Sequence, residues 1–148
     1  MSYFAALVSH DNGPWQPREI DLDGHGDIDV LVETMRRASK GDPTSLLVLE
    51  HEDEWFALVR ADDADDPRVF VSSGRAAGAS AYAETLGVVE VAEEEDDEPA
   101  GDAEILADHG VPPDLLLELA GDDGPDVEAA VSEVAAKAGF AEILDELR

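Results

Sequence analysis

A cluster of carboxylates between Asp21 and Val32 has the spacing that calcium-binding loops use. Asp21, Asp23 and Asp29 stand at loop positions 1, 3 and 9, and Gly26 stands at position 6. Calcium takes about six to eight oxygen ligands, and the glycine allows the sharp turn that brings them together. These three aspartates are therefore the candidate metal ligands, and calcium binding is one hypothesis for the function of the chain.

Two positions of this loop depart from the EF-hand pattern. His25 stands at position 5, where a hard cation prefers oxygen, and Val32 stands at position 12, where an EF-hand has a bidentate glutamate. FG-GAP loops also lack that glutamate, but they occur in many copies and this loop occurs in one. The alternative is an acidic, glycine-rich connection from strand to helix, in which Asp27 or Asp29 caps the helix. The residues favour the cap, and the calcium hypothesis stays open.

The sequence contains no motif of a familiar catalytic class. Cysteine is absent, and the four histidines, at 10, 25, 51 and 109, are scattered without metal-ligand spacing. The motifs HExxH, GxSxG, GxxxxGK[ST] and GxGxxG do not occur. A zinc deaminase needs H-x-E and P-C-x-x-C, and neither is present. We therefore expect no catalytic residues and no cofactor, with an enzyme using a carboxylate site as the remaining alternative.

The charge of the chain limits its partners. The formal net charge is −28 over 148 residues. Residues 89–148 carry 20 acidic side chains against two basic ones, Lys137 and Arg148. Such a density of negative charge repels nucleic acid and anionic membranes and favours basic proteins. One run is a candidate partner-binding segment: Glu93, Glu94, Glu95, Asp96, Asp97 and Glu98.

Hydrophobic periodicity in residues 1–88 predicts the elements that hold these side chains. The order ββαβββα indicates an α+β fold, with a mainly antiparallel sheet of about five strands and two helices packed on it. The expected strands are residues 3–9, 15–22, 45–51, 54–61 and 68–72, and the expected helices are residues 27–39 and 76–86. Hairpins are expected between the first two strands and between the third and fourth.

The last third of the chain reads as a linker followed by helices. Six like charges in succession cannot be buried together, so residues 89–101 are expected to be an acidic linker. Helices are expected at residues 102–108, 112–120, 127–138 and 141–147. The predicted organisation is an α+β domain at 1–88, the linker at 89–101 and a small helical region at 102–148. A region of this size is marginal for independent stability, so it is expected to dock on the N-terminal domain or on a partner.

Two further expectations concern location and one aromatic side chain. No basic leader segment or long apolar run is present, which favours a cytoplasmic protein. Trp55 and Phe56 alternate along one strand, so we expect one ring in the core and the other at the surface. Core packing is the favoured role for Trp55, and contact with a partner is the alternative.

Several strings in the chain resemble those of a known bacterial family. They include Glu54-Trp55-Phe56-Ala57-Leu58-Val59-Arg60, Asp66-Pro67-Arg68-Val69-Phe70-Val71-Ser72, Ala81-Tyr82, Ser2-Tyr3-Phe4-Ala5-Ala6 and Ala138-Gly139-Phe140. With these strings the chain resembles the tRNA adenosine deaminase-associated proteins over nearly its whole length. The resemblance defines no active residues. It implies a non-enzymatic accessory protein near tRNA adenosine-to-inosine editing.

Charge and resemblance together suggest one partner. We expect an acidic face that docks on the basic, tRNA-binding surface of a deaminase, with no direct binding of nucleic acid or membrane by this chain. Such a face would compete with the phosphates of tRNA.

Overall fold

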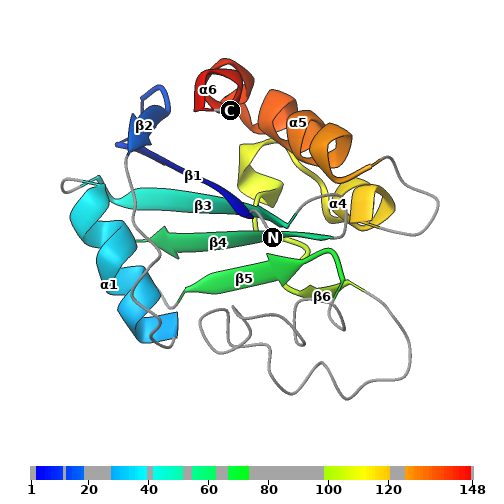
Figure 1. Cartoon of the computed structure of the whole chain (residues 1–148), viewed down its shortest axis with the longest axis horizontal. Coiled ribbons are helices and arrows are strands. Elements are labelled where there is room, and N and C mark those ends of the chain that lie inside the picture. The colour runs from blue at the N-terminus through cyan, green and yellow to red at the C-terminus, as the bar shows by residue number, and fades with distance from the viewer. Residues whose placement is uncertain are drawn as a thin grey trace.

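Continuous apolar runs in the central strands put apolar side chains on both faces of the sheet, and both faces are covered (Figure 1). The computed structural model describes residues 3–11, 13–18, 28–39, 42–51, 55–62, 67–73, 99–120 and 126–147. The fold is α+β, as the sequence predicts. Within these residues, no helix combines the length and the apolar character that a membrane span requires.

The sheet has six strands in the order β2-β1-β3-β4-β5-β6, and every neighbouring pair is antiparallel. The predicted hairpins β1–β2 and β3–β4 are both confirmed. The central strand β3 is almost wholly buried, as its continuous apolar run predicts. The strands are β1 (Tyr3–His10), β2 (Gln16–Arg18), β3 (Thr44–His51), β4 (Trp55–Asp62), β5 (Arg68–Val71) and β6 (Ala100–Gly101).

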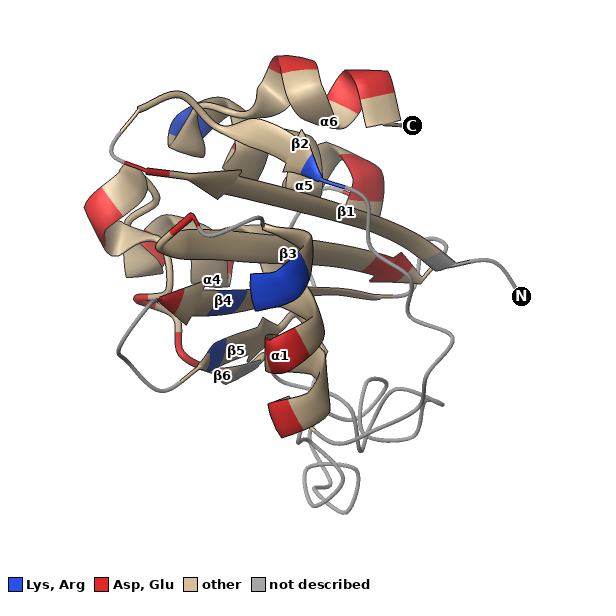
Figure 2. Cartoon of the chain, turned by 90° about the vertical axis from the view of Figure 1, so that its left-hand side faces the viewer, with Lys and Arg blue, Asp and Glu red and all other residues tan. Residues whose placement is uncertain are grey.

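One face of the sheet packs against α1 (Ile28–Ala38), which lies in front of the sheet in Figure 2. Leu31, Val32 and Met35 share one side of this helix and are buried against the sheet. Its first turn contains Asp29 and its last turn contains two arginines, an arrangement that complements the helix dipole.

The opposite face of the sheet packs against α4 (Pro113–Ala120), α5 (Val127–Ala138) and α6 (Ala141–Leu147). These helices share one hydrophobic cluster with strand residues such as Phe56, Leu58 and Phe70. Asp126 caps α5 by accepting a hydrogen bond from the amide of Ala129 at 2.8 Å. The predicted helices at 127–138 and 141–147 are confirmed residue for residue.

The expected helix at residues 102–108 is wrong. The Asp102 side chain accepts a hydrogen bond from the amide of Glu104, which starts a turn, and only a short 3-10 helix, η2 (Ala107–His109), follows. Ile105 and Leu106 are adjacent in sequence and both are fully buried. Burial of two neighbouring side chains suits a turn that inserts into the core better than a helix with one apolar face.

The last two residues of the expected acidic linker, Ala100 and Gly101, form the edge strand β6 beside β5. Gly101 has φ +100°, and a Cβ there would clash with the backbone carbonyl of Val69. Only glycine adopts this positive φ without strain and has no Cβ to clash, so position 101 requires glycine. The expected helix at 76–86 and the run at 93–98 lie outside the described residues. The division into a domain, a linker and a helical region stays a prediction.

Candidate functional site

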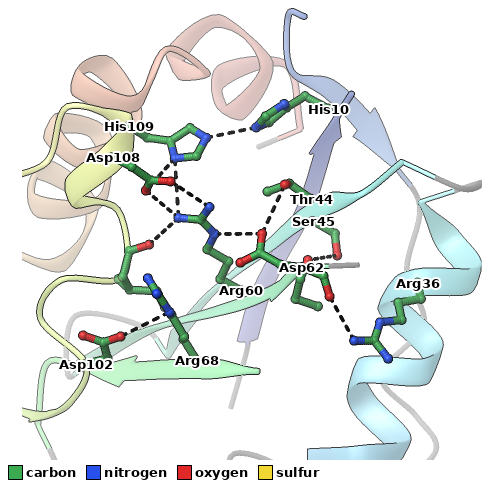
Figure 3. Close-up of polar contacts among 12 residues, drawn as sticks. His10, Arg36, Thr44, Ser45, Arg60, Asp62, Arg68, Asp102, Asp108 and His109 are labelled. Atoms are coloured by element: carbon green, nitrogen blue, oxygen red, sulfur yellow. Dashed lines mark hydrogen bonds and ion pairs between the residues drawn. The ribbon is translucent and has the colours of Figure 1, made fainter. Parts of the chain in front are cut away.

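Polar side chains gather at the edge of the sheet where β1 and β4 end (Figure 3). Both strands pair antiparallel with β3, so they run in the same direction and their C-terminal ends lie at the same edge. His10 ends β1, Arg60 and Asp62 come from the end of β4, and Asp108 and His109 come from η2. We call these five residues the Arg60 network.

Arg60 is the centre of this network and is 7% exposed. Its Nη1 and Nη2 donate to the two carboxylate oxygens of Asp108 at 2.6 and 2.9 Å. Nη1 also donates to the Ile105 carbonyl at 2.9 Å, and Nε donates to Asp62 at 3.2 Å. A guanidinium has five N–H groups. Most of those of Arg60 donate to groups of the protein itself.

Ion pairing with Arg60 governs the titration of Asp108. The hydrogen bonds from the guanidinium, helped by the His109 ring, hold the pKa of the Asp108 carboxyl far below its usual range. In return, the hydrogen bond to Asp108 raises the pKa of Arg60 against the effect of its own burial. Both groups are therefore charged at neutral pH.

A hydrogen-bonded pair of histidines extends the network. The Nε2 atoms of His10 and His109 lie 2.9 Å apart, and His109 Nδ1 lies 3.0 Å from Asp108 Oδ1. A carboxylate only accepts hydrogen bonds, so we assign the Nδ1 proton to His109. Its Nε2 then accepts from His10, and the chain of hydrogen bonds runs from Arg60 through Asp108 and His109 to His10.

Trp15 packs against the outer end of this chain. Its ring contacts His10 edge-on, with centroids 4.4 Å apart, and lies 5.3 Å from the ring of His109. Its indole Nε1 donates to the carbonyl of Ala138 at the end of α5 (2.9 Å), and its other neighbour is Phe140 at 5.6 Å. The tryptophan therefore joins the β1–β2 hairpin to the junction of α5 and α6.

A second, smaller cluster lies beside the same edge of the sheet. Asp42 accepts hydrogen bonds from Ser9 Oγ at 2.7 Å and from Arg18 at 3.0 Å. These two bonds, that of Ser9 first, lower the pKa of the Asp42 carboxyl. The cluster joins β1, β2 and the segment before β3. Its hydrogen-bond donors and acceptors pair with one another.

Stability should decrease as the pH falls below about 6.5, the ordinary pKa of histidine, because burial lowers the pKa of His10 in the folded protein. The unfolded chain binds a proton more readily, so protonation favours unfolding in this range. We expect His10→Gln to reduce the loss of melting temperature between about pH 7 and about pH 5. The measurement is thermal unfolding of both proteins across that range. Equal pH dependence in the two proteins would contradict the assignment to His10.

The geometry of the Arg60 network is that of a structural junction. Arg60, Asp62 and Asp108 each contact a partner from another element, and the network connects β1, β4 and η2. None of its contacts was predicted from the sequence. One signal was available: period-two alternation puts Arg60 on the same face as Phe56 and Leu58, so a buried strand would need a partner for this charge.

A hollow of about 460 Å³ lies next to Trp15, between the β1–β2 turn and the junction of α5 with α6. We call it the Trp15 groove. Among the residues that line it, Glu142 carries the one carboxylate. An enzyme with a carboxylate site would require a converging pair, so this groove does not support that alternative. The lining residues are Pro14, Trp15, Ala136, Gly139, Phe140, Ala141, Glu142 and Ile143.

The outer sides of α4, α5 and α6 are strongly acidic. Seven carboxylates on these helices are exposed, and the one basic residue among their described side chains is Lys137. The helices form one layer on the sheet, so the charges share one side of the molecule. We call this surface the acidic face; its members are Asp114, Glu118, Glu128, Glu133, Glu142, Asp145 and Glu146.

The candidate calcium ligands are only partly placed by the structure. Asp21 and Asp23 lie outside the described residues, as does Asp27, one of the two candidate caps. Asp29 lies exposed in the first turn of α1. Within the described part of the chain, no three histidine or acidic side chains converge in a way that could hold a metal ion.

The sequence offered two candidate partner-binding features, the acidic run at 93–98 and Trp55. Neither forms part of the surface that the structure describes. Residues Glu93–Glu98 lie outside the described residues. Trp55 is 1% exposed and packs on the α1 side of the sheet, while Phe56, equally buried, packs on the side of the C-terminal helices. Core packing therefore accounts for both rings, and the expectation that one of them lies at the surface is wrong because both faces of the sheet are covered.

Comparison with known proteins gives one match. A family model described as Rv3753c-like tRNA adenosine deaminase-associated protein matches residues 3–141. Neither a curated protein nor a solved structure matches the chain.

Proposed function

The chain belongs to the family of Rv3753c-like tRNA adenosine deaminase-associated proteins, and from this premise we propose that it is a non-enzymatic, cytoplasmic accessory protein that docks on a tRNA adenosine deaminase. The observation that carries this proposal is the acidic face, with seven exposed carboxylates on three helices against one lysine. A deaminase that acts on tRNA must present basic residues to the phosphates. The acidic face is complementary to such a surface.

The described arginines do not interrupt the acidic face, because none of them lies on α4, α5 or α6. Each described arginine also contacts a carboxylate or a backbone carbonyl of the chain itself, so it is already engaged within the fold. The carboxylates of the acidic face greatly outnumber the basic groups around them. The arginines and their partners are Arg18 with Asp42, Arg36 with the Asp62 carbonyl, Arg37 with Glu33, Arg60 with Asp62 and Asp108, and Arg68 with Asp102.

Docking of this kind would regulate access of tRNA to the deaminase. Carboxylates of the acidic face would occupy the same lysines and arginines that the tRNA phosphates need, so the two ligands would compete. The negative charge of the chain also argues against direct contact between this protein and tRNA.

Salt should weaken the complex strongly. We expect capture of the tRNA adenosine deaminase from the same organism at about 0.1 M salt and little capture at about 1 M, because the Debye length falls from about 10 Å to about 3 Å. The measurement is a pull-down with the purified full-length proteins. A deaminase that fails to bind at either salt concentration would refute the proposed function.

A further inference from the structure

We propose that the Trp15 groove is the anchor site for one apolar side chain of a basic, amphipathic partner segment. The proposal rests on the proposed function in one respect, that the partner is a basic protein. It adds the place on the surface where affinity arises, because electrostatic complementarity contributes more to specificity and association rate than to affinity. A central apolar anchor surrounded by polar contacts is the usual distribution of binding energy in protein interfaces.

The size and the lining of the groove suit an apolar side chain. Its volume of about 460 Å³ lies in the range of small-ligand pockets, so it is large enough to take one apolar side chain. The walls come from Trp15, Phe140 and Ile143, all with apolar surfaces. Gly139, which ends α5 in the left-handed region (φ +98°), leaves the space above the indole open, since a Cβ there would approach Trp15 Cδ1 to 3.9 Å.

The Trp15 wall is fixed before any partner arrives. The indole donates its hydrogen bond to the Ala138 carbonyl and packs between His10 and Phe140. His10 is in turn held by the Arg60 network. A preformed wall lowers the entropic cost of binding, because the side chains that make the contact are already ordered.

Charge at the rim selects the kind of partner. Glu142 lines the groove, Glu133 lies one turn before Ala136 on α5, and Asp145 and Glu146 are exposed on α6. Leu147, one turn after Ile143, is 38% exposed and extends the apolar strip beyond the groove. In a partner segment, an apolar residue would fill the groove, and a lysine or arginine beside it would pair with the carboxylates around the groove.

The test uses a defined probe and a variant that fills the groove. The probe is a fluorescent leucine–lysine peptide of roughly 14 residues, about four helical turns, and a second peptide has serine in place of leucine. Ala136→Trp places an indole in the groove from an exposed position. Ala129→Trp is the matched control, because it lies exposed on the same side of α5 two turns earlier.

We expect Ala136→Trp to raise the Kd of the leucine–lysine peptide about tenfold, the effect of losing one buried anchor, and Ala129→Trp to leave it unchanged. The serine–lysine peptide should bind about tenfold more weakly than the leucine–lysine peptide. In NMR spectra of the full chain, the indole N–H of Trp15 should shift on binding while that of Trp55, buried on the other side of the sheet, stays in place.

Equal affinity for the two peptides, or an unchanged Kd for Ala136→Trp, would overturn the anchor site. So would a wild-type homodimer that Ala136→Trp dissociates, since the occupant would then be a second copy of the chain. Ile143→Ser, which removes one wall, serves as the second variant if Ala136→Trp does not fold, and the same Kd criterion applies to it. Because the probe is a peptide, these outcomes are independent of capture of the deaminase, which alone tests the proposed function.

Discussion

Arg60→Met should lower the free energy of unfolding by about 3 kcal/mol, because it leaves two carboxylates and a buried carbonyl without their cation. The carboxylates are Asp62 and Asp108, and the carbonyl is that of Ile105. Removal of one partner from a fully buried ion pair costs about 3–5 kcal/mol. The expected loss lies at the lower end because the Asp108 side chain is 58% exposed and water screens part of its charge.

Arg68→Met is the matched control for this experiment. Arg68 stands directly opposite Arg60 in the β4–β5 register, but its side chain is 45% exposed and its contact with Asp102 is long, at 3.5 Å. Its replacement should change the unfolding free energy by no more than about 0.5 kcal/mol. Chemical denaturation of both variants gives the comparison. If the two variants lost the same unfolding free energy, the buried contacts of Arg60 would contribute no more to stability than the exposed contact of Arg68.

Acid titration provides a second readout on the same variants. The pKa of Asp108 is depressed in the folded protein, so its contribution to stability is present above the ordinary aspartate value of 3.8 and is lost as the pH falls below it. In Arg60→Met the largest cause of this depression is removed, and the decrease of stability below about pH 4 should become shallower. The loss assigned to His10 occurs at higher pH, which separates the two effects.

Local periodicity explains why most of the fold could be predicted from the sequence. Continuous apolar runs within residues 44–51 and 55–62 predict two adjacent buried strands, and 3.6-residue periodicity predicts α1, α5 and α6. The failed helix at 102–108 had apolar residues in adjacent positions, and its geometry depends on tertiary contacts of Ile105 and Leu106. A short segment of this kind has too little intrinsic helix stability to resist them.

The candidate site could not be predicted in the same way because its contacts join residues distant in sequence. Trp15 and Ala138 are separated by 123 positions, and Arg60 and Asp108 by 48. Nothing in local composition reveals such pairs. The charge of the C-terminal region was visible in the sequence, but the helical layer that gathers it into one face depends on packing against the sheet.

Reversal of charge on the acidic face should weaken capture of the deaminase by at least about tenfold, mainly through slower association. The variant is Glu133→Lys with Glu142→Lys, which replaces two exposed carboxylates on α5 and α6. Its matched control is Asp29→Lys with Glu33→Lys on α1, which lies on the opposite side of the sheet. The two double variants change the net charge by the same amount. Each also replaces one carboxylate in the first turn of a helix, Glu142 in α6 and Asp29 in α1.

The comparison separates a docking face from a general effect of net charge. If long-range attraction by the whole molecule governed association, the two doubles would weaken binding alike, because beyond a Debye length the partner senses mainly the summed charge. If the helical layer makes the contact, Glu133 and Glu142 lie within that length of the partner and the α1 carboxylates lie across the sheet from it. Association rates measured at several salt concentrations should therefore fall for the first double alone, and equal behaviour of both would remove the acidic face as the docking surface.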